Sequence, residues 1–366
     1  MQQNIQFCTT ADGAKLAYAV DGEGPPLVLA TAWLTHLGPQ WRALAWQPWL
    51  DTFSSDYKLL RYDARGSGLS DRDPAELSVE TWVRDLEAVV DAAGLEQFSI
   101  LASCQRGPAA ITYAARNPER VRKLVLFGTY ALGRKLQQQP PVEIEKTRAV
   151  ASLLPLGWEQ EDNALLQIWA HAFQPSGTQA HWRAWCDMQR AATSAQTAVR
   201  LLEIGWHLDV REAARSIKCP VLVLHPERDG VVPIEAGRML VSLIPGSRFV
   251  ELDSDNHMLL ADEPSWPRLV SEVRGFLADP ASAAAAAGGR MLALDELTPR
   301  ERTVLEGIAD GLDNADLAAA LGLSEKTVRN HVTRLFDKIR VKHRYEAIVR
   351  ARAAGLGSDS RLSRVP

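Results

Sequence analysis

The chain has 366 residues, 46% of them hydrophobic and 23% charged, and it carries a formal net charge of −4 at pH 7. This length suggests two domains, and the composition suffices for a sizeable hydrophobic core. No apolar run reaches the roughly 18 residues that a membrane span requires, and the N-terminus lacks the basic and apolar segments of a signal peptide. The four cysteines form neither a zinc-binding pattern nor a disulfide framework. We therefore expect a cytoplasmic protein with no metal, no cofactor and no membrane partner.

Residues 1–279 show strand-like apolar runs that alternate with helical patterns. A hairpin is predicted at the start, with Asp12-Gly13 as its turn. The later candidate strands are Leu27–Ala30, Lys58–Tyr62, Phe98–Ala102, Lys123–Phe127, Val221–His225 and Arg248–Leu252. This alternation predicts an α/β fold with a mostly parallel sheet between two layers of helices. From about 131 to 215 the strands stop, and this tryptophan-rich helical stretch is predicted to be an inserted cap.

Three side chains that could act as a nucleophile, an acid and a base follow predicted strands. Cys104 lies between small residues where a strand runs into a helix, which is the arrangement of a nucleophile elbow. Asp229 and His257 come just after two later strands. The chain order nucleophile, acid, histidine is the order found in α/β-hydrolases, and His257 would take the proton of Cys104 while Asp229 orients the imidazole.

From about Ile5 to Leu277 the chain resembles the α/β-hydrolase fold. Two further segments carry the resemblance, 63–71 (DARGSGLSD) and 117–121 (NPERV), and these support the fold rather than the chemistry. The resemblance implies an oxyanion hole made by the backbone N–H groups of Trp33 and Gln105. It also implies nucleophilic acyl transfer, and some family members hydrolyse lactones with a cysteine triad.

The elbow departs from the usual Gly-x-Ser-x-Gly pattern because Arg106 replaces a glycine. Arg106 either crowds the site or pairs with a ligand carboxylate, and His36 either lines the pocket mouth or lies at the surface. Cys104 itself could be no more than a small buried side chain. The cap tryptophans fit either a plain hydrophobic core or a pocket for an apolar ligand.

An alanine-rich run that ends in a glycine pair predicts a linker at residues 280–290. From Arg290 onward the chain has 14 Lys and Arg against 11 Asp and Glu, whereas the preceding 289 residues have 27 against 34. A basic C-terminal segment on an otherwise acidic chain is the charge distribution that binding of this segment to phosphate groups requires. The segment 355–366 is polar and is predicted to be a disordered tail.

Residues 291–354 predict a small helical domain. Thr298 and Glu301 form a capping box, Gly322 makes a tight turn, and Ser324 caps a later helix. That helix combines a buried apolar stripe with a basic outer face, which fits the major groove of DNA.

The segment 297–351 resembles the LuxR-type helix-turn-helix family, which implies an all-α domain of four helices. The third helix is the reader, and the fourth, around Tyr345–Ala353, is commonly used for dimer contact. Ala315 stands where a basic residue is usual and Arg340 where glycine is usual. By exposure and by this resemblance, the candidate DNA-binding residues are Lys326, Thr327, Arg329, Asn330 and Arg334.

These features leave three interpretations. The first is a homodimeric, ligand-responsive transcription regulator that binds double-stranded DNA and senses a small apolar ester, lactone or carboxylic acid. The second is an active cysteine hydrolase with a fused DNA-binding module. The third is a regulator whose front domain only dimerises. The fused DNA-binding domain and the irregular elbow favour the first.

Overall fold

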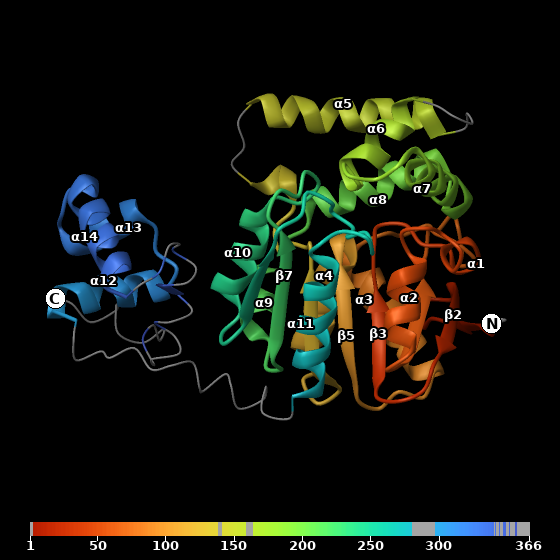
Figure 1. Ribbon diagram of the computed structural model, residues 1–366, viewed down its shortest axis with the longest axis horizontal. Helices are drawn as coiled ribbons and strands as arrows, with labels where there is room; N and C mark the ends of the chain where they lie inside the picture. Colours follow the sequence, from red (N-terminus) through yellow and green to blue (C-terminus); the bar gives the residue numbers. More distant parts are fainter. Residues whose placement is uncertain are drawn as a thin grey trace.

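The computed structural model describes residues 3–137, 141–158, 164–279 and 297–339, together with single residues at 341, 344, 347, 348, 351 and 356. Within residues 3–279, two hydrophobic cores flank one sheet. A separate core belongs to the C-terminal helices. Figure 1 shows the sheet, the helices that cover it and the C-terminal helices in blue. Of the described helices, none combines the length and the apolarity that a bilayer crossing demands.

The sheet has eight strands in the order β1-β2-β4-β3-β5-β6-β7-β8. The strands are β1 (Ile5–Thr9), β2 (Lys15–Asp21), β3 (Pro26–Ala30), β4 (Lys58–Asp63), β5 (Phe98–Ser103), β6 (Val121–Phe127), β7 (Val221–Pro226) and β8 (Arg248–Leu252). The predicted leading hairpin is present, with β2 antiparallel to both β1 and β4, and all other pairs are parallel. At the hairpin turn Gly13 has φ +90°, a conformation that glycine adopts without steric cost.

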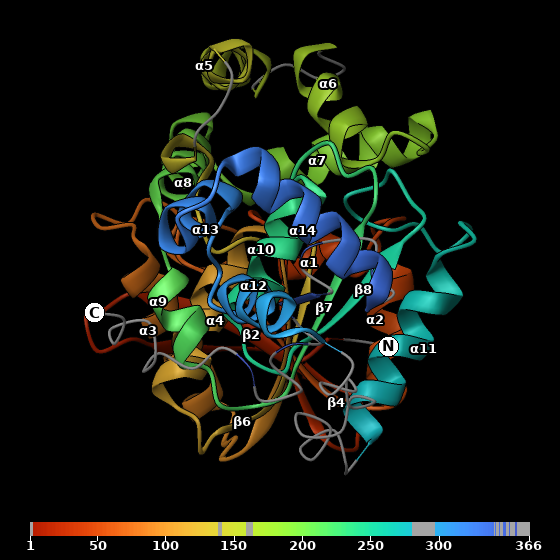
Figure 2. The same cartoon turned by 90° about the vertical axis from the view of Figure 1, so that its left-hand side faces the viewer.

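Alternate side chains of the central strands enter different cores. Ile100 packs on one face with α3 (Val79–Ala92) and α4 (Gly107–Arg116), whereas Leu101 packs on the other with α2 (Gln47–Ser54) and α11 (Trp266–Ala278). Both faces of the sheet are therefore buried, which is why its strands read as continuous apolar runs. Helices α1 (Leu37–Gln40), α9 (Arg211–Ser216) and α10 (Ile234–Leu243) complete the layers, which Figure 2 shows from the side.

The insertion between β6 and β7 is helical, as the sequence predicts. It comprises the short turn η2 (Arg134–Leu136) and the helices α5 (Pro141–Trp158), α6 (Ala164–Phe173), α7 (Gln179–Ala192) and α8 (Ala195–His207). The described residues between 131 and 215 form no strand, and a single bridge between Leu132 and Asp209 closes the base of this cap. In Figure 1 the cap helices lie over the ends of the strands.

The segment 63–71 has the structural role that the resemblance implied. The Asp63 carboxylate accepts the backbone N–H groups of Leu37 and Leu69 at 3.1 and 2.9 Å. Arg65, which is buried, donates to Asp85 and to Asp12 of the leading hairpin, each at 2.8 Å. This network ties the loop after β4 to α3 and to the hairpin.

The C-terminal domain contains α12 (Pro299–Ala309), α13 (Asn314–Leu321) and α14 (Glu325–Lys338). Thr298 and Glu301 form the predicted capping box, and Gly322 ends α13 with φ +62°. The predicted linker, and the predicted fourth helix apart from a few single residues, lie outside the described residues. Ala347, Ile348 and Ala351 of that helix belong to the domain core.

One predicted boundary differs from the structure. Leu356, which the sequence placed in the disordered tail, is only 5% exposed and packs in the core of the C-terminal domain. Its N–H donates to the Ala351 carbonyl at 2.9 Å. Apolar burial thus extends past residue 355, and the rest of the predicted tail lies outside the described residues.

Candidate functional site

Cys104 occupies a strained turn between β5 and α4. Its φ of +51° is rare for a residue with a side chain, and such strain is concentrated at functional sites. The turn needs close packing behind it, because a Cβ added at Gly107 would lie 2.0 Å from the Thr129 hydroxyl oxygen. That hydroxyl donates to the Cys104 carbonyl at 2.5 Å. Thr129 was missed by sequence reasoning, since no local pattern links it to the elbow.

The structure brings Cys104, Asp229 and His257 together in one buried cluster. The Nδ1 atom of His257 lies 2.6 Å from Oδ2 of Asp229, and His257 and Cys104 line the same small chamber. The other carboxylate oxygen of Asp229 accepts the N–H groups of Val231 and Val232 at 2.8 and 2.9 Å. The carboxylate is thus fixed, and it fixes the imidazole in turn.

Electrostatics favour the protonated form of His257. Burial opposes its charge, but the adjacent Asp229 carboxylate and the Cys104 sulfur outweigh this and raise the pKa of His257 to about 10. The cluster is therefore built around a charged imidazole held by the Asp229 carboxylate.

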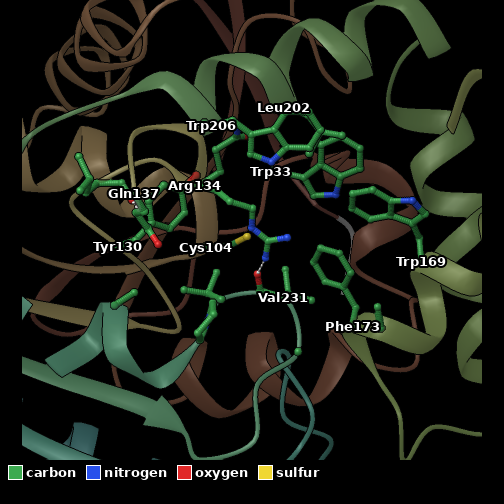
Figure 3. A pocket seen from close by; sticks show the side chains of 18 of the residues that line it. Trp33, Cys104, Tyr130, Arg134, Gln137, Trp169, Phe173, Leu202, Trp206 and Val231 are labelled. Carbon is green, nitrogen blue, oxygen red and sulfur yellow. Dashed lines mark hydrogen bonds between the residues drawn. The ribbon is translucent and has the colours of Figure 1, made fainter. Parts of the chain in front are cut away.

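The residues predicted for the oxyanion hole lie beside Cys104. Trp33 and Gln105 both line the same cavity as Cys104. Figure 3 shows Trp33 and Cys104 in this cavity. The chain reaches Trp33 through Ala32, whose φ of +62° is a conformation that usually favours glycine. The Ala32 N–H donates to the Ser103 hydroxyl at 3.3 Å, which anchors this turn to the end of β5.

Two predicted ligand-binding residues lie elsewhere. Arg106 is 2% exposed and is not among the residues lining the cavity; its guanidinium stacks 4.8 Å above the Trp82 ring and donates to the Trp33 carbonyl at 3.2 Å. It holds the Trp33 peptide instead of facing a ligand. His36 also lies outside the cavity lining, because its ring caps α1 by accepting the Gly38 N–H at 3.2 Å.

A cavity of about 460 Å³ lies between Cys104 and the cap. Its wall is mostly apolar, and the aromatic rings of Trp33 and Trp169 stack with their centroids 5.9 Å apart. Other lining residues include Tyr130, Leu132, Ile168, Phe173, Leu202, Trp206, Val231 and Val232. Of the cap tryptophans, Trp169 and Trp206 line this cavity, whereas Trp158 and Trp185 are core residues. From the sequence, the cap tryptophans as a group fitted either a hydrophobic core or a ligand pocket. The sequence could not assign individual rings to one or the other.

A smaller chamber of about 30 Å³ lies on the other side of the triad. Cys104 and His257 line it together with Gln189 of α7. The Gln189 side-chain oxygen is buried without a hydrogen-bond partner. A space of this size holds a water molecule, and an orphan acceptor is the kind of partner that a buried water has.

The histidine is also tied to the cap. The backbone N–H of His257 donates to the carbonyl of Phe173, the last residue of α6, at 2.9 Å. The Phe173 ring meets the imidazole edge-on with centroids 5.1 Å apart. Among the described residues, no group of three or more His, Cys, Asp or Glu side chains is placed to hold a metal ion.

The candidate DNA-binding side chains share one helix of the C-terminal domain. Along α14, Lys326, Arg329, Asn330 and Arg334 are exposed, while Val328, Val332 and Leu335 are buried. Thr327 is half-buried, because its N–H and hydroxyl engage the capping Ser324 at 3.2 and 2.8 Å. Arg329 pairs only loosely with Glu325 at 3.5 Å, so it can turn toward a phosphate or base edge.

Two contacts that sequence reasoning did not anticipate join segments of this domain. Lys338 at its end pairs with Glu301 at 2.7 Å, which draws α14 onto the start of α12. This ion pair lowers the pKa of Glu301 to about 2. Arg344 is partly buried and donates to the Asn314 side chain at 2.9 Å. Lys338 thus ties the end of α14 to α12, and Arg344 ties the segment after α14 to the start of α13.

Comparisons with known proteins agree with the fold of the sheet domain and with the assignment of the C-terminal helical domain. The family profile for the alpha/beta hydrolase fold matches residues 25–167, and the profile for bacterial regulatory proteins of the luxR family matches residues 295–351. The chain therefore joins an α/β-hydrolase domain to a LuxR-type DNA-binding domain, which is the organisation of a regulator.

Individual relatives match either the hydrolase domain or the DNA-binding domain. A putative carbamate hydrolase, RutD, from Azorhizobium caulinodans is 26% identical over 263 residues, which cover 69% of this chain and 91% of that protein. The crystal structure of an esterase, RhEst1, from a Rhodococcus species matches 75% of this chain and 98% of its own, with a TM-score of 0.62 and 28% identity. The transcriptional regulatory protein DesR from Bacillus subtilis is 42% identical over 59 residues, 16% of this chain and 30% of that protein.

The raised pKa of His257 predicts how stability depends on pH. Its charge stabilises the folded chain fully below its ordinary pKa of 6.5, and this stabilisation is lost as the pH rises through about 10. The urea midpoint of the hydrolase domain should therefore fall between these pH values, and it should fall less in His257→Gln. The exposed His207→Gln serves as the control. Parallel losses in the wild type and in His257→Gln would contradict the buried imidazolium.

The exposed face of α14 predicts the salt dependence of DNA binding. Arg329→Ala combined with Arg334→Ala should weaken binding to a double-stranded oligonucleotide and reduce the salt slope of log K by about 1 to 2. Fluorescence anisotropy across a salt series measures both effects. Arg302→Ala, which removes an exposed cation from α12, should leave the slope nearly unchanged. An unaltered slope in the double variant would show that another surface contacts DNA.

Proposed function

We propose that the protein is a ligand-responsive transcription regulator that senses a small apolar ester, lactone or carboxylic acid in the cavity beside Cys104. The observation that carries this proposal is the aromatic cavity of about 460 Å³, formed by the hydrolase domain of a chain that also carries a DNA-binding domain. Cavities that bind small molecules occupy a few hundred to about a thousand Å³ and are mainly apolar with a few placed polar groups.

The lining of the cavity supports sensing because it comes from both the sheet and the cap. Trp33 follows β3 and Val231 follows β7, whereas Trp169 and Phe173 belong to α6 of the cap. A ligand between these surfaces contacts both at once. Ligand binding therefore changes how the cap rests on the sheet, and such a change is what a regulatory domain needs to pass on.

On the output side, the proposed regulator works in the cytoplasm as a homodimer on double-stranded DNA. A helix-turn-helix dimer places two reading helices about one turn of DNA apart, so two half-sites are bound together. The exposed basic face of α14 supports this role, with Lys326, Arg329 and Arg334 available to phosphates and base edges.

A cavity-filling variant tests the sensing role. Apolar esters, lactones and acids are first screened by thermal shift, and DNA affinity is then measured with and without each ligand that binds. Ala172→Trp should fill the cavity and remove the response to ligand while keeping the DNA affinity of the ligand-free protein. Ala180→Trp, at an exposed position of α7, is the matched control. A panel in which nothing binds would favour a front domain that only dimerises.

The triad supports a second candidate function, hydrolysis of an ester or lactone. The Cys104 thiolate would attack the carbonyl carbon while the N–H groups of Trp33 and Gln105 hold the oxyanion. Protonated His257 would give its proton to the leaving alkoxide as the acyl thioester forms. A water molecule in the chamber beside Gln189, deprotonated by His257, would then cleave the thioester and release the acid.

Kinetics with a chromogenic ester separate turnover from sensing alone. With p-nitrophenyl acetate we expect a burst of about one p-nitrophenolate per chain, followed by a slower steady phase, because acyl transfer to the thiolate precedes deacylation. Cys104→Ala should remove the burst, and Cys8→Ala should retain it. Absence of both a burst and steady hydrolysis would overturn the hydrolase candidate, whereas rapid steady hydrolysis that Cys104→Ala abolishes would overturn a role in sensing alone.

A further inference from the structure

We propose that the cavity selects an anionic ligand, an apolar or aromatic carboxylate, and that Arg134 is the residue that recognises the carboxylate. This inference rests on the proposed binding of a ligand beside Cys104 and specifies the chemical class of that ligand. It assigns a role to a residue that sequence reasoning did not single out.

Arg134 reaches the cavity from the base of the cap. It begins η2, shortly after β6, and its guanidinium points into the space beside Cys104 and Val231 (Figure 3). One guanidinium nitrogen donates to the Val231 carbonyl at 2.8 Å. This bond fixes the direction of the side chain and leaves further N–H groups for a second acceptor, since a guanidinium carries five donors.

No carboxylate of the described chain neutralises Arg134. Among the residues that line the cavity, the only carboxylate belongs to Glu235. The Glu235 side chain is 72% exposed and turns toward Arg238, 3.5 Å away. Arg134 is half-buried, so part of its guanidinium is open to a partner in the cavity. A planar carboxylate is the group whose geometry matches a guanidinium.

A second polar group of the cavity lining, Gln105, is held by the protein itself. The side-chain nitrogen of Gln105 donates to the Leu201 carbonyl, which fixes the orientation of the amide. Its oxygen is buried, so the amide is held within the wall and Arg134 remains the charged group of the cavity that is open to a ligand. The expected ligand thus has an apolar skeleton and a carboxylate at the Arg134 end.

Alkylation of Cys104 tests this inference with defined probes. The reagents are para-(bromoacetyl)benzoate and its neutral counterpart para-(bromoacetyl)benzamide; the thiolate displaces bromide from either one and forms a thioether. Labelling of Cys104 is followed by peptide mass spectrometry, with Cys104→Ala to identify reaction at other cysteines. Because a charge-assisted pair adds binding energy only for the acid, we expect the benzoate to react at least about tenfold faster than the benzamide at low salt.

Three variants make the result specific to Arg134. Arg134→Gln should remove the preference for the benzoate, and Arg134→Lys should retain part of it. Arg215→Gln removes an exposed cation of α9 that pairs with Glu212, and it should keep the full preference. Equal rates in the wild type, or a preference that survives Arg134→Gln, would overturn the assignment of Arg134 while leaving ligand binding intact. A Cys104 that reacts with neither reagent would contradict the accessible cavity, and both proposals would fall.

Discussion

The left-handed turn at Cys104 is the constraint on which the rest of the site depends. It projects the sulfur from the end of β5 toward His257, and it exists only because Gly107 lets α4 approach Thr129 of the neighbouring strand end. Gly128, at that same strand end, has φ +53°, and a Cβ there would lie 3.3 Å from the His257 ring. Cys104 and His257 are therefore placed by two close backbone approaches, and the strain of the turn is held by the packing around it.

Arg106 shows how the elbow accommodates a large residue where the usual Gly-x-Ser-x-Gly pattern has glycine. The guanidinium is buried beneath Trp33, bonded to its carbonyl and stacked on Trp82. Burial lowers the pKa of Arg106, with Tyr62 and Asp85 acting in the opposite direction. Arg106 therefore holds the Trp33 peptide in place while staying out of the cavity lining.

Much of this architecture could be predicted from the sequence. Apolar runs located the six later strands, and the order of Cys104, Asp229 and His257 indicated the triad, because parallel strands end at one edge of the sheet. What could not be predicted are contacts between residues far apart in the chain. The partner of Arg106, the burial of Leu356 and the position of Arg134 all depend on how distant segments pack, and neither composition nor periodicity records that packing.

The bond between the His257 N–H and the Phe173 carbonyl couples the loop after β8 to the end of α6. A shift of α6 must therefore either carry the imidazole with it or break this bond. The separation of the His257 ring from Cys104 thus depends on where the cap rests, although the two side chains belong to the sheet domain.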